Sequence, residues 1–98
     1  MFVNVIKSHR DIVAVCDKEL LGKCFEEDIF QLDIKENFYK GEEVPEEEAI
    51  RIMKSLSVED STFNIVGEKA VKAAIKAGVI VEDNINRIAG VPFALSLL

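Results

Sequence analysis

The segment TFNIVGEKAVKAAIKAG, residues 62–78, is the clearest guide to the architecture of the chain. Its first part is rich in β-branched and aromatic side chains, which predicts a strand over residues 62–66. Gly67 then leads into a helix that runs to about Ala77. Gly78 is the expected stop, because glycine readily adopts the left-handed backbone found at helix ends. The inner face of this helix is formed by three apolar side chains, Val71, Ala74 and Ile75.

A second helix is predicted from Pro45 to about residue 56. Proline is tolerated at the first helical position, where its missing N–H would have no partner. Glutamates at positions 46–48 follow, and their charges suit the positive end of the helix dipole. Apolar side chains then recur at helical spacing and form one face, Ala49, Ile52, Met53 and Leu56.

The N-terminal third reads as a hairpin followed by a short helical turn. Residues 2–6 and 11–16 are two β-rich runs joined by a short turn, which is typical of a hairpin. Asp17 is the expected cap of a helical turn over residues 18–21 that stops at Gly22.

Alternation predicts a half-buried strand over residues 29–34, with Ile29, Gln31 and Asp33 on one side. Residues 37–43 are expected to form a loop. Residues 79–81 are expected to form a connector or a short strand. Two further short strands are expected over residues 85–89 and 91–95.

Strands and helices therefore do not alternate strictly, and a purely parallel sheet is not expected. The pattern predicts one compact α+β domain over residues 1–98. Its sheet should be mixed or mostly antiparallel, with the two main helices packed on one face.

Length and charge restrict the functional classes. Ninety-eight residues suit a single domain, and neither a membrane span nor a signal peptide is recognisable, so we expect a cytoplasmic protein. The net charge is −6, and residues 17–60 carry fourteen acidic and six basic side chains. Any nucleic-acid contact would therefore have to come from the outer segments.

Metal, cofactor and catalytic sites are not indicated. Cys16, Cys24 and His9 are too few and too widely spaced for a metal site. We interpret both cysteines as buried apolar residues, with a redox role as the alternative. Nucleophile and metal motifs are lacking, so we expect no cofactor and assign no catalytic residue.

An aromatic segment with a basic neighbour is the first candidate site. It consists of Phe38, Tyr39, Lys40 and Gly41. Tyrosine is enriched at binding hot spots, so these residues are candidates for binding a protein partner. We further expect Gly41 to take a positive φ. The alternative is that Phe38 packs into the core and Tyr39 covers its edge.

The junction between strand and helix is the second candidate, for an anion or for weak RNA binding. Exposed N–H groups at a helix start can hold an anion, and a lysine stripe can follow a phosphate backbone. The alternatives are tight packing at the glycine and a solvated lysine face. The residues concerned are Asn64, Gly67, Lys69, Lys72 and Lys76.

Four ordered blocks, residues 16–23, 37–42, 64–68 and 90–94, give the chain a family likeness. The chain resembles the small archaeal family called domain of unknown function 424, from about Phe2 to Leu95. The resemblance implies a cytoplasmic protein of about this size, with genes near translation genes and no established activity. Members often carry histidine where this chain has Phe93, which suggests a structural or interface position.

Three hypotheses follow. The first is a non-catalytic binding module with a protein partner in a translation or ribonucleoprotein complex. The second is a small-ligand binder or enzyme that uses the junction near Asn64 and Gly67. The third is a homo-oligomer that associates through the apolar C-terminal segment, residues 93–98, unless that segment adds a strand to its own sheet.

Overall fold

A computed structural model of the chain describes residues 1–97 and confirms the expected strand–glycine–helix unit. Strand β6 spans Ser61–Val66 and helix α3 spans Glu68–Ala77, with Gly67 between them. Gly78 ends α3 in the left-handed conformation, at φ 79°. The spacing of the apolar residues in this segment therefore places both elements correctly.

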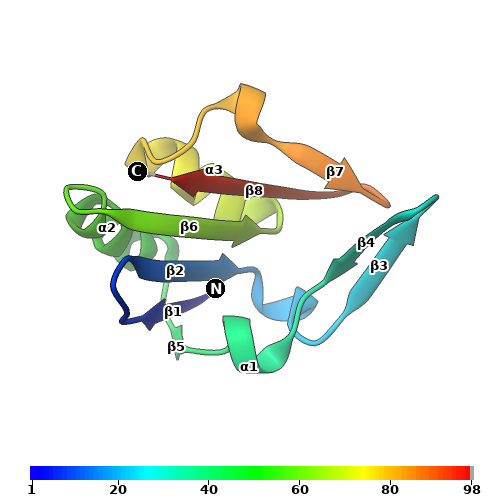
Figure 1. Cartoon of the computed structure of the whole chain (residues 1–98), viewed down its shortest axis with the longest axis horizontal. Helices are drawn as coiled ribbons and strands as arrows, with labels where there is room; N and C mark the ends of the chain where they lie inside the picture. Colours follow the sequence, from blue (N-terminus) through cyan, green and yellow to red (C-terminus); the bar gives the residue numbers. More distant parts are fainter. Residues whose placement is uncertain (98) are drawn as a thin grey trace.

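Among residues 1–97 six strands form one sheet in the order β5-β1-β2-β6-β8-β7 (Figure 1). Only the pair β2–β6 is parallel, so the expected mixed, mostly antiparallel sheet is confirmed. Besides β6, the strands are β1 (Phe2–Ile6), β2 (Asp11–Cys16), β5 (Glu42–Glu43), β7 (Asn86–Ile88) and β8 (Val91–Leu97).

Helix α2, Glu46–Leu56, lies beside α3 on one face of the sheet, and Figure 1 shows both helices behind the strands. Alternate residues of the central strands point toward them and form the main core. Met53 and Phe63 are its largest fully buried side chains. Lys76 of α3 also bonds Glu46 of α2, with Nζ and Oε1 3.1 Å apart.

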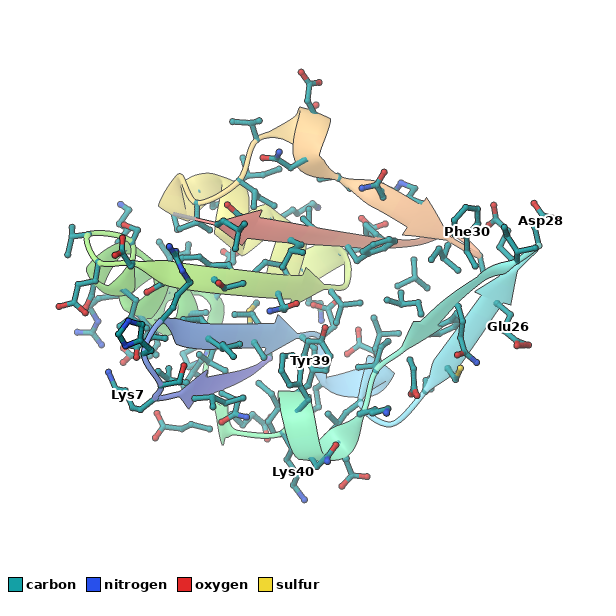
Figure 2. All side chains as sticks on the ribbon, in the orientation of Figure 1. Lys7, Glu26, Asp28, Phe30, Tyr39 and Lys40 are labelled. Carbon is teal, nitrogen blue, oxygen red and sulfur yellow. The ribbon has the colours of Figure 1, made fainter. Side chains whose placement is uncertain are left out.

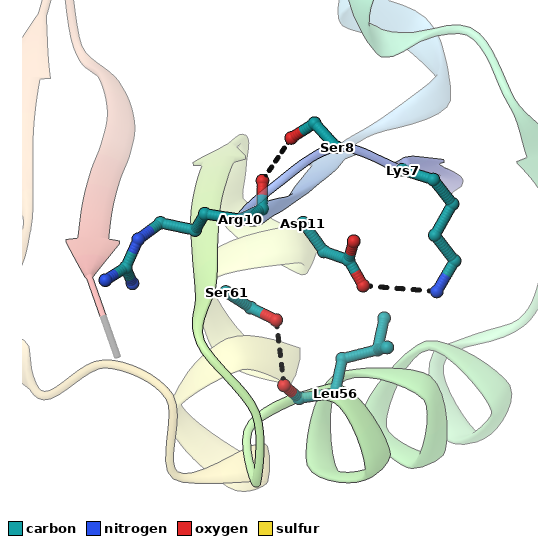
Figure 3. Close-up of polar contacts among 6 residues, drawn as sticks. All are labelled: Lys7, Ser8, Arg10, Asp11, Leu56 and Ser61. Atoms are coloured by element: carbon teal, nitrogen blue, oxygen red, sulfur yellow. Dashed lines mark hydrogen bonds and ion pairs between the residues drawn. The ribbon is translucent and has the colours of Figure 1, made fainter.

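Short polar contacts fix the ends of these elements (Figure 3). In the β1–β2 turn the Ser8 hydroxyl donates to the Arg10 carbonyl, and Lys7 pairs with Asp11 at 3.1 Å. The buried Ser61 hydroxyl donates to the Leu56 carbonyl at 2.9 Å. That bond ties the end of α2 to the start of β6.

The opposite face of the sheet is covered at one end only. There Cys16, Val66 and Ile34 form a second buried cluster. The covering elements are a 3₁₀ turn η1 (Lys18–Leu20), the short helix α1 (Glu36–Tyr39), and strands β3 (Cys24–Glu27) and β4 (Phe30–Asp33).

Strands β3 and β4 pair with each other in a separate two-stranded sheet. The expected strand over residues 29–34 is thus β4, one half of a hairpin whose other half the sequence pattern did not indicate. The expected loop over residues 37–43 is also corrected, because it contains α1 and the edge strand β5. Residues 79–81 form a connector that leads into a 3₁₀ turn η2, Glu82–Asn84.

The C-terminal apolar segment adds an interior strand to the protein's own sheet, since β8 lies between β6 and the edge strand β7. Its Leu95 and Leu97 side chains remain exposed. Leu98, the last residue of the segment considered for self-association, lies outside the described residues. No helix within residues 1–97 has the length and apolar character needed to cross a bilayer.

Candidate functional site

Tyr39 supports the second core from α1. Its ring packs against the cluster of Cys16, Ile34 and Val66, and burial raises the pKa of its hydroxyl to about 12. The Phe38 and Tyr39 rings meet edge to face with centroids 4.9 Å apart. Tyr39 therefore contributes to the packing of the second core, and only part of its side chain is exposed.

Lys40 is the most exposed side chain of the aromatic segment, and its nearest acidic partner is Glu36 at 3.8 Å. Gly41 does not take the positive φ that we expected. Glycine is required there for another reason: a Cβ atom would lie 2.3 Å from the carbonyl oxygen of Val3 in β1. Gly41 thus allows the chain to pass closely along the sheet edge.

The start of α3 is occupied by a carboxylate of the chain itself. Asp17 is only 3 % exposed, and its Oδ2 and Oδ1 accept the backbone N–H groups of Lys69 and Ala70 at 3.0 and 2.7 Å. Burial raises the pKa of Asp17 above its ordinary value, and the two backbone hydrogen bonds oppose that rise. An anion would have to displace this carboxylate, so the structure favours the alternative of tight packing at Gly67.

Gly67 has a packing explanation as well. It adopts φ 110°, and a Cβ atom there would lie 2.3 Å from Cγ of Asp17. The expected role of Asp17 as a helix cap holds in a different form. Its side chain makes no capping bond to the 3₁₀ turn that follows it and caps α3 instead.

The remaining residues of the second candidate site do not converge. Phe63 and Ile65 pack toward the helices, so Asn64 between them lies on the other face of the sheet. The exposed lysines lie on α3, and Lys76 is paired with Glu46. Of the residues predicted for this site, Lys69 lines a hollow at the start of α3, together with Asp17 and Glu68. The ligand or enzyme hypothesis based on Asn64 and Gly67 stays a prediction.

The two cysteines differ in environment. Cys16 is fully buried, and burial raises the pKa of its thiol to about 12, which keeps it protonated and unreactive. Cys24 is exposed on β3, so the interpretation of both cysteines as core residues is wrong for Cys24. Within residues 1–97 no group of three or more histidine, cysteine or acidic side chains could hold a metal ion.

The β3–β4 hairpin is the exposed feature that the sequence analysis missed. It extends from one end of the sheet (Figure 1), and its strands contain three acidic side chains, Glu26, Glu27 and Asp33, but no basic one. Asp28 adds a fourth acid at the tip, where it takes a positive φ of 55°. Beside it Ile29 is 92 % exposed and Phe30 is 60 % exposed.

The hairpin is attached to the body at its base and near its tip. Phe25 and Leu32, which pair across its strands, pack on the second core. Nearer the tip, Glu27 accepts the backbone N–H of Ala89 in the β7–β8 turn at 2.7 Å. Figure 2 shows Phe30 beside the end of β7, with Asp28 at the tip and Glu26 on the outer side.

A cavity of about 270 Å³ lies between the hairpin and the sheet edge. It is lined by Glu27, Phe30, Asn86, Arg87, Ile88 and Phe93. Arg87 is held by Glu68 at 2.9 Å and by the carbonyl of Gly90 at 3.1 Å. A second hollow of about 190 Å³ lies beside the same turn, and its acidic lining residues are Asp17, Glu19 and Glu68.

Comparison with known proteins places the chain in a family. The model of the family described as "Protein of unknown function (DUF424)" matches residues 6–97. The chain belongs to this family. The resemblance noted in the sequence is thereby confirmed, although the DUF424 description assigns no activity. No curated protein matches the chain.

A solved structure shares the DUF424 fold. The chain is similar to the crystal structure of an uncharacterized conserved protein from the archaeon Methanopyrus kandleri, with 26 % sequence identity and a TM-score of 0.85. The match covers 98 % of this chain and 89 % of the other. Phe93, the position that the resemblance marked as structural or interfacial, lines the cavity under the hairpin.

Proposed function

We propose that the chain is a non-catalytic binding module that docks a protein partner on the tip of its β3–β4 hairpin. The observation that carries the proposal is the exposure of Ile29 and Phe30, two large apolar side chains that the fold leaves in solvent. Burying such a side chain contributes roughly 1.5–3 kcal/mol relative to leaving it exposed. A partner that covers the tip gains this energy without disturbing the core.

The turn does not explain the large apolar side chain at position 29. Two-residue hairpin turns with a positive φ at the first central residue favour glycine at that first position. Here the turn is Asp28-Ile29, and Asp28, not Ile29, takes the positive φ of 55°. The turn geometry therefore does not require isoleucine at position 29, and its exposed side chain is available for a contact surface.

Charge indicates the kind of partner. Four carboxylates and no basic side chain lie between residues 24 and 33, so the hairpin repels phosphate and attracts basic surfaces. Of the three α3 lysines expected to contact RNA, Lys76 is paired with Glu46. In the outer segments Lys7 is paired with Asp11 and Arg87 with Glu68. These pairings favour a basic protein over RNA.

The specific form of the proposal is a partner within a cytoplasmic translation or ribonucleoprotein complex. Proteins that contact ribosomal RNA present basic surfaces, which complement an acidic hairpin. The resemblance to a family with genes near translation genes agrees with this partner class. Lys40 and the outer side of α1 lie away from the hairpin tip (Figure 2) and form the far margin of the proposed surface.

Affinity purification from a lysate of the native source tests the proposal. Tagged wild type is compared with Ile29→Ser and Phe30→Ser, with Val58→Ser as the matched control. Val58 is also exposed, but it belongs to the loop between α2 and β6. Figure 1 shows that loop at the end of the sheet opposite the hairpin. Lys40→Glu is included to probe the margin of the surface.

We expect the two hairpin variants to lose the same partner while the control retains it, with and without nuclease. Equal recovery by all variants would refute docking at the hairpin. A partner that disappears after nuclease treatment would show that RNA, not the hairpin tip, makes the connection.

A further inference from the structure

We propose that the cavity under the hairpin is an anchor pocket for one large apolar side chain carried on a basic segment of the partner. This inference rests on the proposed function and makes it more specific. It assigns an occupant to the cavity lined by Phe30, Ile88 and Phe93, and a charge to the residues on either side of that occupant.

The apolar wall of the cavity sets the chemistry of the anchor. Phe30 comes from the hairpin and Phe93 from β8, so two aromatic rings from separate elements border the same space. Ile88 of β7 is almost fully buried and adds an aliphatic surface. Aromatic and aliphatic surfaces of this kind bind apolar side chains through burial of their common surface.

The size of the cavity favours a side chain over a cofactor. Pockets for drug-sized ligands usually measure about 300–1,000 Å³. At about 270 Å³ this cavity is smaller. Interface hot spots often consist of a single buried side chain in such a pocket, surrounded by weaker contacts.

The charged groups in the lining already have partners. Glu27 accepts the N–H of Ala89, and Arg87 is held by Glu68 and by the carbonyl of Gly90. These contacts partly neutralise both charges, so the apolar wall is the main binding surface of the cavity. The cavity therefore favours an apolar side chain, and the surface around it determines the charge of the flanking residues.

Acidic side chains surround the cavity. Glu26 and Asp28 lie at the outer side and tip of the hairpin. Across the β7–β8 turn the smaller hollow adds the exposed carboxylate of Glu19, with Lys69 as its one basic lining residue. Its other two acids contribute less, because Asp17 is buried and Glu68 is paired with Arg87. Residues flanking the anchor would be placed over this surface, so a segment with lysine or arginine on both sides of the anchor complements it.

Three synthetic heptapeptides test the inference by NMR titration of the ¹⁵N-labelled full chain. The first has a central phenylalanine flanked by three basic residues on each side. The second replaces that phenylalanine with serine, and the third replaces all basic residues with glutamate. We expect the first to shift the amides of residues 27, 30, 86–88 and 93, with at least ten-fold weaker binding of the other two.

Phe30→Ala removes one wall at an exposed position, so the variant should fold. It should bind the first peptide at least ten-fold more weakly than the wild type. Val81→Ala is the matched control, because Val81 is exposed at the start of the η2 turn, outside the cavity lining. It should bind as the wild type does.

Equal binding of the phenylalanine and serine peptides would overturn the anchor pocket, as would shifts confined to other residues. Equal binding of the basic and acidic phenylalanine peptides would overturn the charge assignment and the inference with it. The proposed function fails separately, when the Ile29 and Phe30 variants retain every captured partner. A hairpin-dependent partner combined with no peptide binding refutes only the inference.

Discussion

Asp17 joins two parts of the chain that are 52 residues apart in sequence. It directly follows β2, yet its carboxylate satisfies two of the N–H groups at the start of α3. Gly67 makes room for it, because any larger residue would collide with the carboxylate. The helix start that resembles an anion site is thus a structural contact between β2 and α3.

Substituting Asp17 tests this contact. Asp17→Ala should lower the free energy of unfolding by about 1–2 kcal/mol, as expected for loss of a helix cap. Urea unfolding followed by circular dichroism gives the value. A change within experimental error would show that the two hydrogen bonds contribute nothing net.

The same side chain makes a prediction about pH. Because burial raises the pKa of Asp17 in the folded state, the folded protein holds this proton more tightly than the unfolded chain does. Stability relative to Asp17→Asn should therefore be greatest below the ordinary pKa of 3.8 and decline as the pH rises through the raised pKa. Unfolding of both proteins between pH 4 and pH 7 measures this, and an advantage of wild type that grows with pH would contradict it.

Tyr39 and Lys40 should separate packing from surface contacts. Tyr39→Ala removes a partly buried ring from the second core, so we expect a loss of roughly 3 kcal/mol, near the lower end for deletion of a large aromatic side chain. Lys40→Glu should change stability by less than about 0.5 kcal/mol, because the side chain is exposed. Thermal unfolding of both variants measures these changes in stability. A Tyr39→Ala variant as stable as the wild type would assign Tyr39 to the surface.

At the scale of elements, the sequence predicts those with regular hydrophobic patterns and misses those held by tertiary contacts. Residues 62–78 and 45–56 show clear strand or helix periodicity and lie where expected. Strand β3 is Cys-Phe-Glu-Glu, in which one residue packs and three are exposed, so it carries little β-pattern. The alternation in β4, with an Asp-Ile turn before it, was the only available sign of a hairpin partner.

Helix α1 illustrates the same limit. Four residues cannot sustain a helix alone, and α1 has no side-chain cap. It forms because Tyr39 packs on the second core and Asn4 of β1 donates to the carbonyl of Phe38 at 2.8 Å. Neither contact is local in sequence, so a loop was the reasonable expectation.

The hairpin should be the least stable of the paired elements. An isolated two-stranded hairpin is marginal in water, and this one is attached mainly by Phe25, Leu32 and the bond from Ala89 to Glu27. Hydrogen exchange should give amides of β3 and β4 at least about ten-fold lower protection than those of β2 and β6. Equal protection would mean that the hairpin opens only with the whole fold.

At the scale of the whole molecule, the two faces of the sheet differ. One face is covered by α2 and α3 along its length, whereas the other is covered only at the end where η1, α1 and the hairpin pack. The uncovered end carries the aligned row Ile6, Ile12, Thr62 and Leu97. Beside that row lies the exposed side chain of Leu95.

This uncovered end tests whether the chain associates with itself. Leu95→Thr and Leu97→Thr together should change the free energy of unfolding by less than about 1 kcal/mol, since both side chains are exposed in the single chain. Sedimentation equilibrium should then give the same mass for the variant and the wild type. A wild-type dimer that the variant loses would show that a second copy covers this face.

The candidate site could be predicted only in part. The sequence indicated a partner site at the aromatic segment. In the structure Tyr39 and Gly41 are explained by packing, and Lys40 is the residue of the segment with an exposed side chain. Ile29 and Phe30 were expected on the two faces of a half-buried strand. Their exposure depends on how far the hairpin extends beyond the sheet, which no local pattern encodes.

Site-specific photo-crosslinking in living cells tests docking at the hairpin most directly. A benzophenone amino acid is placed at position 29, and at position 58 as the exposed control. The account predicts a nuclease-resistant crosslink to one basic protein from position 29 and none to that protein from position 58. Three results would contradict it: a crosslink from position 29 to RNA, no crosslink from position 29, or a crosslink from positions 29 and 58 to the same protein.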